Sequence, residues 1–272
     1  MEAGHGKSQQ GLDVTGQSGG PERRHTARAF GLAGGDLDIR LDDVDRPVAV
    51  TRVLAFCLDG LAAGEAAESV VWEWTLAERL QGLLAIVIAG GTTAALWQTR
   101  CERCRAGIEI DIPLSAFVGA PRHGAITCRS PDGHTITARL PRGTDTRIWR
   151  DNAGGAGAMA AMLVDGVDGE APAPGWLMPQ AWLGPLADAL AESDPLTVLQ
   201  LQAGCPNCGH DNVIDFDLEG WLLALLADQQ QHLIDDVHRL AGAYHWTEAA
   251  ICALPHWRRR AYLARIERET AS

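Results

Sequence analysis

Four of the seven cysteines form two close pairs that resemble metal-binding knuckles. Cys101 and Cys104 occur in "CERC", and Cys205 and Cys208 occur in "CPNCGH". A Cys-x-x-Cys turn at the tip of a β-hairpin directs two thiolates to one point, whereas a structural Zn²⁺ is normally held by four Cys or His ligands. Each pair therefore supplies half of a tetrahedral site, and together they predict one structural zinc ion per chain.

The segments that carry the two pairs match each other at an offset of 104 residues, from Cys101 to Cys205. Apolar and polar residues alternate on both sides of each pair, which predicts strand, knuckle and strand. The 100 residues between Cys104 and Cys205 exceed the about 15 to 20 of a simple zinc ribbon, so the intervening chain must loop out. Further matches pair Trp97 with Leu201, Gln98 with Gln202, Ile110 with Ile214, Asp111 with Asp215, Ile112 with Phe216, Leu114 with Leu218 and Phe117 with Trp221.

Two other interpretations of the cysteines remain open, namely reduced pairs without metal and redox-active pairs. A redox role is disfavoured because neither pair opens a helix after a strand, as thioredoxin-type motifs do. His210 is a possible replacement for one thiolate, although four cysteines suffice. Arg103 and Arg105 would offset the negative charge of a four-thiolate centre. A shell closed by protein ligands has no position for water, so we expect a structural site without metal catalysis.

The sequence lacks the motifs of common catalytic sites. It contains no Gly-x-Gly-x-x-Gly turn, phosphate loop, Gly-x-Ser-x-Gly elbow or His-Glu-x-x-His pair. Adjacent acidic residues such as Asp235 and Asp236 diverge by about 100° on a helix and do not converge on one substrate atom. We therefore expect a protein that is not an enzyme and has no small-molecule substrate.

Composition limits the partners and the compartment. The longest apolar run, 83–89, is far shorter than the ~20 residues that cross a bilayer, so no membrane partner is expected. The first 20 residues lack the features of a secretory signal, which predicts a reducing cytoplasmic location. The net charge of −12 disfavours nucleic acid, although a local basic stretch, "WRRRAYLARIER", lies at 257–268.

Changes in composition and periodicity divide the chain into five segments. We expect a disordered tail over 1–35, a helical segment with the first cysteine knuckle over 36–120, a β-hairpin and a Gly/Ala/Pro-rich insertion over 121–178, the second knuckle unit over 179–217 and a C-terminal helical arm over 218–272. The predicted fold class is α+β. Its centre is a duplicated helix–strand–Cys knuckle–strand unit that forms a zinc-ribbon-like site.

Leucine and valine recur at helical spacing from about 218 to 241, which predicts one long amphipathic helix in the arm. We expect this helix to end at Gly242. Thr247 is suited to cap a second, short helix, and Pro255 to open a third. The third helix is basic and carries aromatic residues.

The arm also carries a resemblance to a known family. "CPNCGH", "IDFDLEGWL" and "VHRLAGAYHWTEAAICALPHWRRRAYLARI" together resemble phage-type baseplate proteins similar to the T-even-phage baseplate hub assembly chaperones. The family pattern is a helix, a Tyr-Gly-Trp turn, a short acidic-apolar helix and an Arg-rich helix ending in Tyr-Leu. His245 stands where glycine is usual. The pattern matches at Asp236, Val237, His238, Tyr244, Trp246, Glu248, Ile251, Leu254, Arg258, Arg259, Arg260, Tyr262 and Leu263.

The resemblance implies a structural or assembly-chaperone protein of a contractile tail or injection system. Its partners would be hub, spike or wedge proteins of the baseplate, and it would act in the cytoplasm or be incorporated in the assembled particle. An alternative function is a zinc-ribbon regulatory protein that binds nucleic acid through Arg258, Arg259 and Arg260. A simpler interpretation of the arm is a helical hairpin with packed aromatics and solvated arginines. The predicted partner-binding residues are Tyr244, Trp246, Trp257, Arg258, Arg259, Arg260 and Tyr262.

Overall fold

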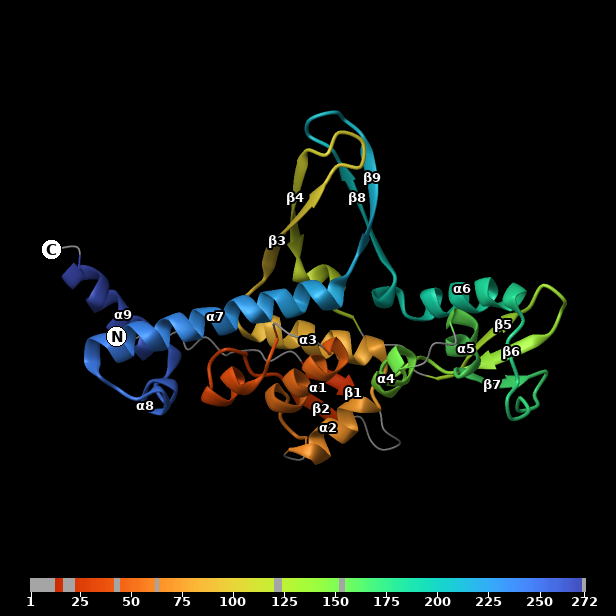
Figure 1. Ribbon diagram of the computed structural model, residues 1–272, viewed down its shortest axis with the longest axis horizontal. Helices are drawn as coiled ribbons and strands as arrows, with labels where there is room; N and C mark the ends of the chain where they lie inside the picture. The colour runs from red at the N-terminus through yellow and green to blue at the C-terminus, as the bar shows by residue number, and fades with distance from the viewer. Residues whose placement is uncertain are drawn as a thin grey trace, which may run out of the picture.

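The computed structural model describes residues 13–16, 23–41, 45–61, 64–119, 124–151 and 155–270. Figure 1 shows a central helical body from which two β-hairpins rise, with an insertion on one side and a helical arm on the other. The fold is mixed α+β, as predicted. Within the described ranges, no helix combines the length and the apolar character needed to cross a bilayer.

Helices α1 (Arg46–Cys57), α2 (Glu65–Trp72) and α3 (Leu76–Ala89) form the central body. Thr75 starts α3 with a capping box, in which its hydroxyl accepts the Glu78 N–H and the Glu78 carboxylate accepts the Thr75 N–H. The side chains of α3 are buried along most of its length. This helix is therefore the centre of the main core, and α1 packs on one side of it and the arm helix on the other.

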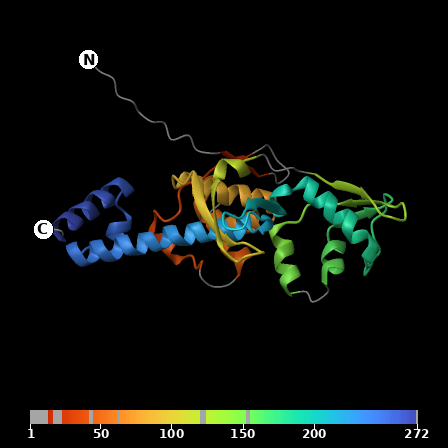
Figure 2. The ribbon, with the colours of Figure 1, turned by 90° about the horizontal axis from the view of Figure 1, so that it is seen from above.

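The two hairpins have the same strand register. Strand β3 (Ala94–Arg100) pairs with β4 (Gly107–Pro113), and β8 (Leu199–Gly204) pairs with β9 (Asp211–Phe216). Trp97 lies opposite Ile110, and Leu201 lies opposite Ile214, so the pairing is preserved at the offset of 104 residues. We call the four strands and their tip loops, 94–113 and 199–216, the stalk. Figures 1 and 2 show its hairpins side by side above the helices.

Aromatic side chains fix the base of the stalk to the body. The Phe216 ring lies 5.1 Å from the ring of Trp97, 5.8 Å from that of Phe117 and 5.3 Å from that of Trp221. Phe117 belongs to the short helix η2 (Leu114–Phe117), which follows the first hairpin. One ring therefore joins both hairpins to the start of the arm helix, and edge-to-face and stacked contacts of this kind add to the stability gained from burial.

The insertion between the hairpins has a core of its own. Strands β5 (Ile126–Arg129) and β6 (Thr135–Ala138) form the predicted hairpin, and β7 (Val164–Val167) adds an unpredicted third strand. Helices α4 (Gly143–Asp151), α5 (Gly155–Ala161) and α6 (Leu183–Ser193), with η3 (Gln180–Trp182) and η4 (Pro195–Thr197), complete this region. Trp182 and Leu186 are buried against the sheet. The insertion core therefore extends past the predicted boundary at 178, because α6 packs on this sheet rather than on the second hairpin.

The arm consists of α7 (Leu218–Tyr244), α8 (Glu248–Cys252) and α9 (His256–Thr270). Helix α7 runs through Gly242, so the predicted end at this residue is wrong. An exposed glycine costs a helix only about 1 kcal/mol, which neighbouring contacts offset. The helix ends instead at His245, which is left-handed with φ 54°. Thr247 caps α8 as predicted, and its hydroxyl accepts the Ala250 N–H.

The predicted disordered tail is ordered over the part that the structure describes. Strands β1 (Asp13–Gly16) and β2 (Arg23–Thr26) pair with each other, and η1 (Gly34–Asp38) follows. Ala27 and Phe30 are buried in the main core. The structure thus has paired strands and a short helix in stretches where the composition predicts a disordered tail, and burial of Ala27 and Phe30 holds the second stretch against the body. Residues 1–12 and 17–22 lie outside the described residues.

Candidate metal centre

The four paired cysteines meet at the tip of the stalk. All four Sγ atoms lie within 4.8 Å of one another. Cys101 Sγ lies 3.7 Å from Cys208 Sγ, and Cys104 Sγ lies 3.6 Å from Cys205 Sγ. Four sulfurs at about 2.3 Å from a tetrahedral metal would be about 3.8 Å apart. The arrangement is compatible with a metal site, and the predicted ligands are brought together across two distant parts of the chain.

The same distances exclude disulfide bonds between the pairs. A disulfide places its sulfurs about 2.05 Å apart, whereas all seven cysteines are free thiols. Cys101 and Cys205 are buried and form a small apolar cluster with Ile108. The tip is thus held by few apolar contacts of its own.

Hydrogen bonds favour the thiolate form of two of these cysteines. The backbone N–H of Ala106 and the Asn207 amide, 3.6 Å away, donate to Cys104 Sγ and lower the pKa of this thiol to about 6. Burial raises the pKa of Cys101, but backbone N–H donors from Cys104 and Arg103 outweigh this effect and lower it overall. Thiolates are the form that ligates metals.

Cys208 titrates in the opposite direction. The His210 backbone N–H favours its thiolate, but burial and the three neighbouring sulfurs outweigh that bond and raise its pKa to about 12. The neighbouring sulfurs therefore disfavour a negative charge on Cys208. A divalent cation among the sulfurs would reverse this preference, because a bound cation stabilises every thiolate around it.

Comparison with protein-family models, with curated proteins and with solved structures gives no match. What the chain does is therefore inferred from its own residues.

The two tip loops have the same backbone structure. The Cys101 N–H donates to the Ala106 carbonyl at 2.9 Å, and the Cys205 N–H donates to the His210 carbonyl at 2.8 Å. The N–H four residues after each of these cysteines returns to the cysteine carbonyl at 2.9 Å. These returning residues are Arg105 and Gly209, with φ of 61° and 69°. One loop thus places glycine in the left-handed conformation, and the other places arginine there.

Substitutions at these two positions are expected to have opposite effects. Arg105→Gly should raise the free energy of unfolding by less than about 1 kcal/mol, because relief of left-handed strain is partly offset by the freedom of glycine in the unfolded chain. Gly209→Ala should lower it by about 1 kcal/mol, since a Cβ there would meet no atom within 4 Å and only the backbone is strained. Urea denaturation measures both values, and Arg105→Ala separates charge from conformation. A loss of stability in Arg105→Gly would contradict the prediction.

Asn212 joins the two hairpins below the sulfurs and was missed by sequence reasoning. Only 1% of this residue is exposed. Its Oδ1 accepts the Glu102 N–H at 3.0 Å, and its Nδ2 donates to the carbonyls of Ala203 and His210, both at 3.0 Å. A signal was present in the sequence, because Asn212 stands where the first hairpin has Ile108. A polar residue at a buried repeat position indicates a hydrogen-bonding role.

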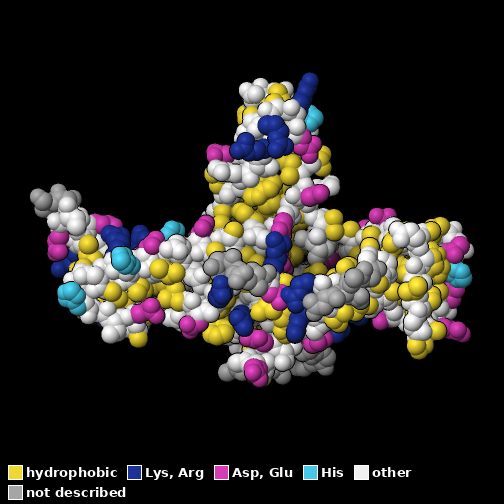
Figure 3. All heavy atoms as spheres, viewed as in Figure 1, with side chains coloured by type: hydrophobic (Ala, Val, Ile, Leu, Met, Phe, Trp, Pro, Cys, Tyr) yellow, Lys and Arg dark blue, Asp and Glu magenta, His cyan; other side chains and the backbone are white. Residues whose placement is uncertain are grey.

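Charged residues surround the tip, and His210 lies next to it without belonging to the sulfur cluster. Arg103 and Arg105 are exposed there. Figure 3 shows Lys and Arg side chains gathered near the end of the stalk. Their positive charge is placed to offset the negative charge of the thiolates.

The predicted partner-binding residues of the arm fall into two groups. Tyr244 stacks on Trp246 at 4.8 Å, and Tyr262 contacts the Trp246 ring edge-to-face at 4.9 Å. This aromatic trio packs against the small arm core of Leu240, Ile251 and Leu263. The remaining four lie on α9: Trp257 is 71% exposed, Arg258 and Arg260 are exposed, and Arg259 is buried.

Proposed function

We propose that the four cysteines bind one structural Zn²⁺ and that the protein is a non-enzymatic baseplate component of a phage-like contractile tail or injection system. In this role it would act as a structural or assembly-chaperone protein. The four sulfurs at mutual distances close to those of a tetrahedral shell are the observation that supports a metal-clamped scaffold. Four protein ligands would leave no coordination position for water, which argues against hydrolytic metal chemistry.

Zinc is the metal that suits this donor set best. Soft thiolates in a tetrahedral arrangement select zinc or an iron–sulfur centre over hard cations. Two Cys-x-x-Cys loops that face each other are the arrangement of a zinc ribbon. The shared register of the hairpins and the matching tip loops support a duplicated unit whose two halves hold one ion between them.

The clamp would position the arm. The second hairpin ends at Phe216, and α7 begins at Leu218, so fixing the hairpins also fixes the root of this 27-residue helix. Figure 2 shows α7 extending away from the body and carrying the last two helices at its far end. A rigid arm of this kind suits a protein that presents a binding surface to a larger assembly.

Trp257 is the residue of the arm that best fits a partner contact. Exposed tryptophans on a monomer surface are uncommon, and buried tryptophans are among the strongest contributors to protein interfaces. Arg258 and Arg260 flank it on α9. The aromatic trio packs Tyr244, at the end of α7, against Trp246 and against Tyr262 of α9. Its role would be to hold α9 in place.

Trp257→Ala is expected to weaken binding to a tail partner while leaving the fold intact. Truncation of an interface tryptophan typically costs 2 kcal/mol or more, about 30-fold in Kd. The measurement is co-purification of the tagged protein with hub, spike and wedge proteins encoded near its gene, followed by titration of the captured partner. Leu177→Ala is the matched control, because Leu177 is a 77% exposed apolar residue of the insertion.

Retention of every partner at unchanged affinity by Trp257→Ala would contradict the proposed surface. Deletion of 243–272 is a coarser test that should abolish capture. The alternative nucleic-acid role is weakened because Arg259, one of its three arginines, is turned inward and buried. Salt-dependent binding of duplex DNA at micromolar protein, with no tail partner captured, would favour that alternative.

A further inference from the structure

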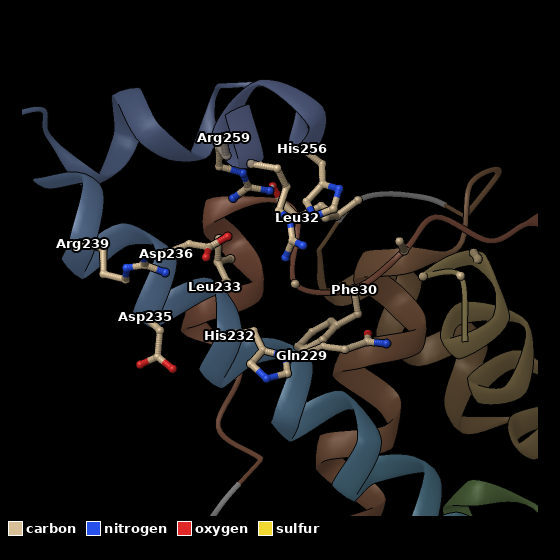
Figure 4. Close-up of a pocket in the computed structure, with 16 residues that line it drawn as sticks. Phe30, Leu32, Gln229, His232, Leu233, Asp235, Asp236, Arg239, His256 and Arg259 are labelled. Atoms are coloured by element: carbon tan, nitrogen blue, oxygen red, sulfur yellow. The ribbon is translucent and has the colours of Figure 1, made fainter. Parts of the chain in front are cut away.

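A cavity of about 660 Å³ lies between α7, α9 and the loop at 29–32. In Figure 4, His256 and Arg259 on α9 face His232, Asp236 and Arg239 on α7. Leu32 and Phe30 lie on the loop beside them. The cavity is distinct from the metal centre, which lies at the tip of the stalk, and from the exposed Trp257, which does not line it.

Arg259 is a buried cation without adequate partners. Only 1% of the residue is exposed, and its Nη2 donates to the Leu32 carbonyl at 3.2 Å. Its Nε and Nη1 are buried and make no hydrogen bond within the part of the chain that the structure describes. Each unsatisfied buried donor costs about 1 to 3 kcal/mol, and a buried charge without a counter-ion costs more. The surrounding structure therefore leaves two donor atoms of this guanidinium for a hydrogen-bond acceptor from outside the described chain.

Arg79, the other fully buried arginine among the described residues, shows that the fold can satisfy such a group. Arg79 Nη1 donates to Thr51 Oγ1 at 3.0 Å and to the Val71 carbonyl at 3.1 Å, and its Nη2 donates to the Pro47 carbonyl at 2.8 Å. Arg79 thus has three acceptors, whereas Arg259 has one carbonyl. A purely structural role explains the three hydrogen bonds of Arg79, but it does not explain the missing acceptors of Arg259.

The other charged side chains that line the cavity, Arg239 and Arg260 against Asp235 and Asp236, balance one another. Arg239 donates to Glu267 at 3.0 Å, and Arg260 is exposed at the rim. Asp235 accepts from Gln231 at 3.2 Å, and neither Asp235 nor Asp236 has a hydrogen bond to Arg259 among the described contacts. Three arginines and two aspartates line the cavity, together with two exposed histidines. Among the lining residues, the charge that would attract an anion is therefore that of Arg259.

We propose that this cavity binds an oxyanion, a carboxylate or phosphate group, through Arg259. Guanidinium N–H groups form short, charge-assisted hydrogen bonds with both kinds of oxygen, and arginine suits this role because it remains charged when buried. Nε and Nη1 are shielded from solvent in this conformation, so entry of the anion requires side chains at the rim of the cavity to rotate. Exposed rotamers change within picoseconds to nanoseconds. The site is independent of the proposed baseplate role.

The test uses the full-length protein with inorganic phosphate and glutarate as probes. Thermal unfolding is followed at rising concentrations of each, with sodium chloride at matched ionic strength as the reference. The proposal expects a saturable rise of Tm with at least one probe, and the more effective probe identifies phosphate or carboxylate as the preferred group. No saturable rise with either probe would overturn the proposal.

Variants connect the response to this residue. Arg259→Leu removes the unpartnered charge and is expected to bind the effective probe at least tenfold more weakly. Arg258→Leu is the matched control, since Arg258 is exposed on the same helix and does not line the cavity. Equal responses of wild type and Arg259→Leu would overturn the proposal.

A measurement on the wild-type protein covers the case in which Arg259→Leu does not fold. The Nε–H resonance of Arg259, assigned with Arg259→Lys, should move during the same titrations while that of Arg258 stays unchanged. An unmoved Arg259 resonance at saturating probe would equally overturn the proposal.

Discussion

Cys205→Ser is expected to release the metal and to unfold the tip of the stalk while its base and the main helical core stay folded. Structural zinc contributes about 10 to 16 kcal/mol of apparent binding free energy in zinc-finger peptides, and isolated two-stranded hairpins are marginal in water. The apolar cluster at the tip contains only Cys101, Ile108 and Cys205 as fully buried residues. The tip therefore has little else to hold it, whereas the base is anchored by Phe216 and its aromatic neighbours.

Elemental analysis and amide hydrogen exchange together measure this effect. The wild type should contain about one zinc per chain, and the variant should lose it together with the exchange protection of β3, β4, β8 and β9 at their tip ends. Cys128→Ser is the matched control, because Cys128 is a free thiol of the insertion, away from the stalk. A metal-free wild type with a fully protected stalk would contradict the proposed clamp, and stoichiometric iron would replace zinc as its metal.

Arg79→Met is expected to cause the second large loss, about 3 to 5 kcal/mol of unfolding free energy. Removing this guanidinium takes three charge-assisted hydrogen bonds, to Thr51, the Val71 carbonyl and the Pro47 carbonyl, out of the centre of the body. The Pro47 carbonyl keeps the Thr51 hydroxyl as a donor, and the Val71 carbonyl keeps the Trp74 N–H. The Arg79 guanidinium also lies 5.1 Å above the ring of Trp72. One side chain thus links α1, the end of α2 and α3. Its loss should therefore weaken the packing of these three helices on one another.

The dependence of this loss on pH follows from Glu219. Burial raises the pKa of Glu219, and the nearby charge of Arg79 opposes that rise. Without Arg79, the folded-state pKa of Glu219 should rise further. As pH rises, Glu219 would then lose its proton at a lower pH in the unfolded chain than in the folded protein. The free energy of unfolding of the variant therefore falls as pH rises through the folded-state pKa of Glu219. The deficit of Arg79→Met should therefore be larger at pH 7 than at pH 4.

Urea denaturation at the two pH values measures both predictions. Arg52→Met is the matched control, because Arg52 is an exposed arginine of α1. A loss below about 1 kcal/mol at pH 7 would show that solvent or neighbouring groups replace the hydrogen bonds of Arg79. A deficit that does not change with pH would be explained by the lost hydrogen bonds alone. Glu219 would then make no contribution to it.

The strands of the stalk and the sulfur cluster were accessible to sequence reasoning because their signals are local. Alternation of period two identifies each strand, and the spacing of Cys101 from Cys104 defines a tip loop. The match between the two copies at a fixed offset then indicates that the two tip loops belong together. This inference does not require the structure of the intervening chain. Asn212 was accessible in principle, because it interrupts the match between the copies. Its partners, the Glu102 N–H and the Ala203 and His210 carbonyls, come from both hairpins and are brought together only by the fold.

Other features depend on contacts that no local pattern records. Phe30 anchors a segment whose average composition predicts disorder, and one such anchor does not alter that average. Strand β7 pairs with β6 across a gap that holds two helices, so its glycine-rich sequence acquires a partner only in the folded chain. Arg259 belongs to a run of three arginines that predicts a solvated surface, and only packing against the 29–32 loop distinguishes it from its neighbours.

The insertion leaves and re-enters the body at neighbouring points. Gln81 Nε2 donates to the Phe117 carbonyl at 2.7 Å where the chain departs, and Leu196 lies beside the same small pocket where it returns. The core of the insertion is separate from the main core, and Arg142 meets Glu73 of the body in an exposed ion pair at 3.0 Å. Segments whose ends lie close together tolerate replacement well. Helix α4 of the insertion packs on α1 and α2, with the Arg147 guanidinium 4.9 Å from the Trp72 ring. We therefore expect that a graft which keeps α4 and replaces the part of the insertion beyond it would leave the four sulfurs in place.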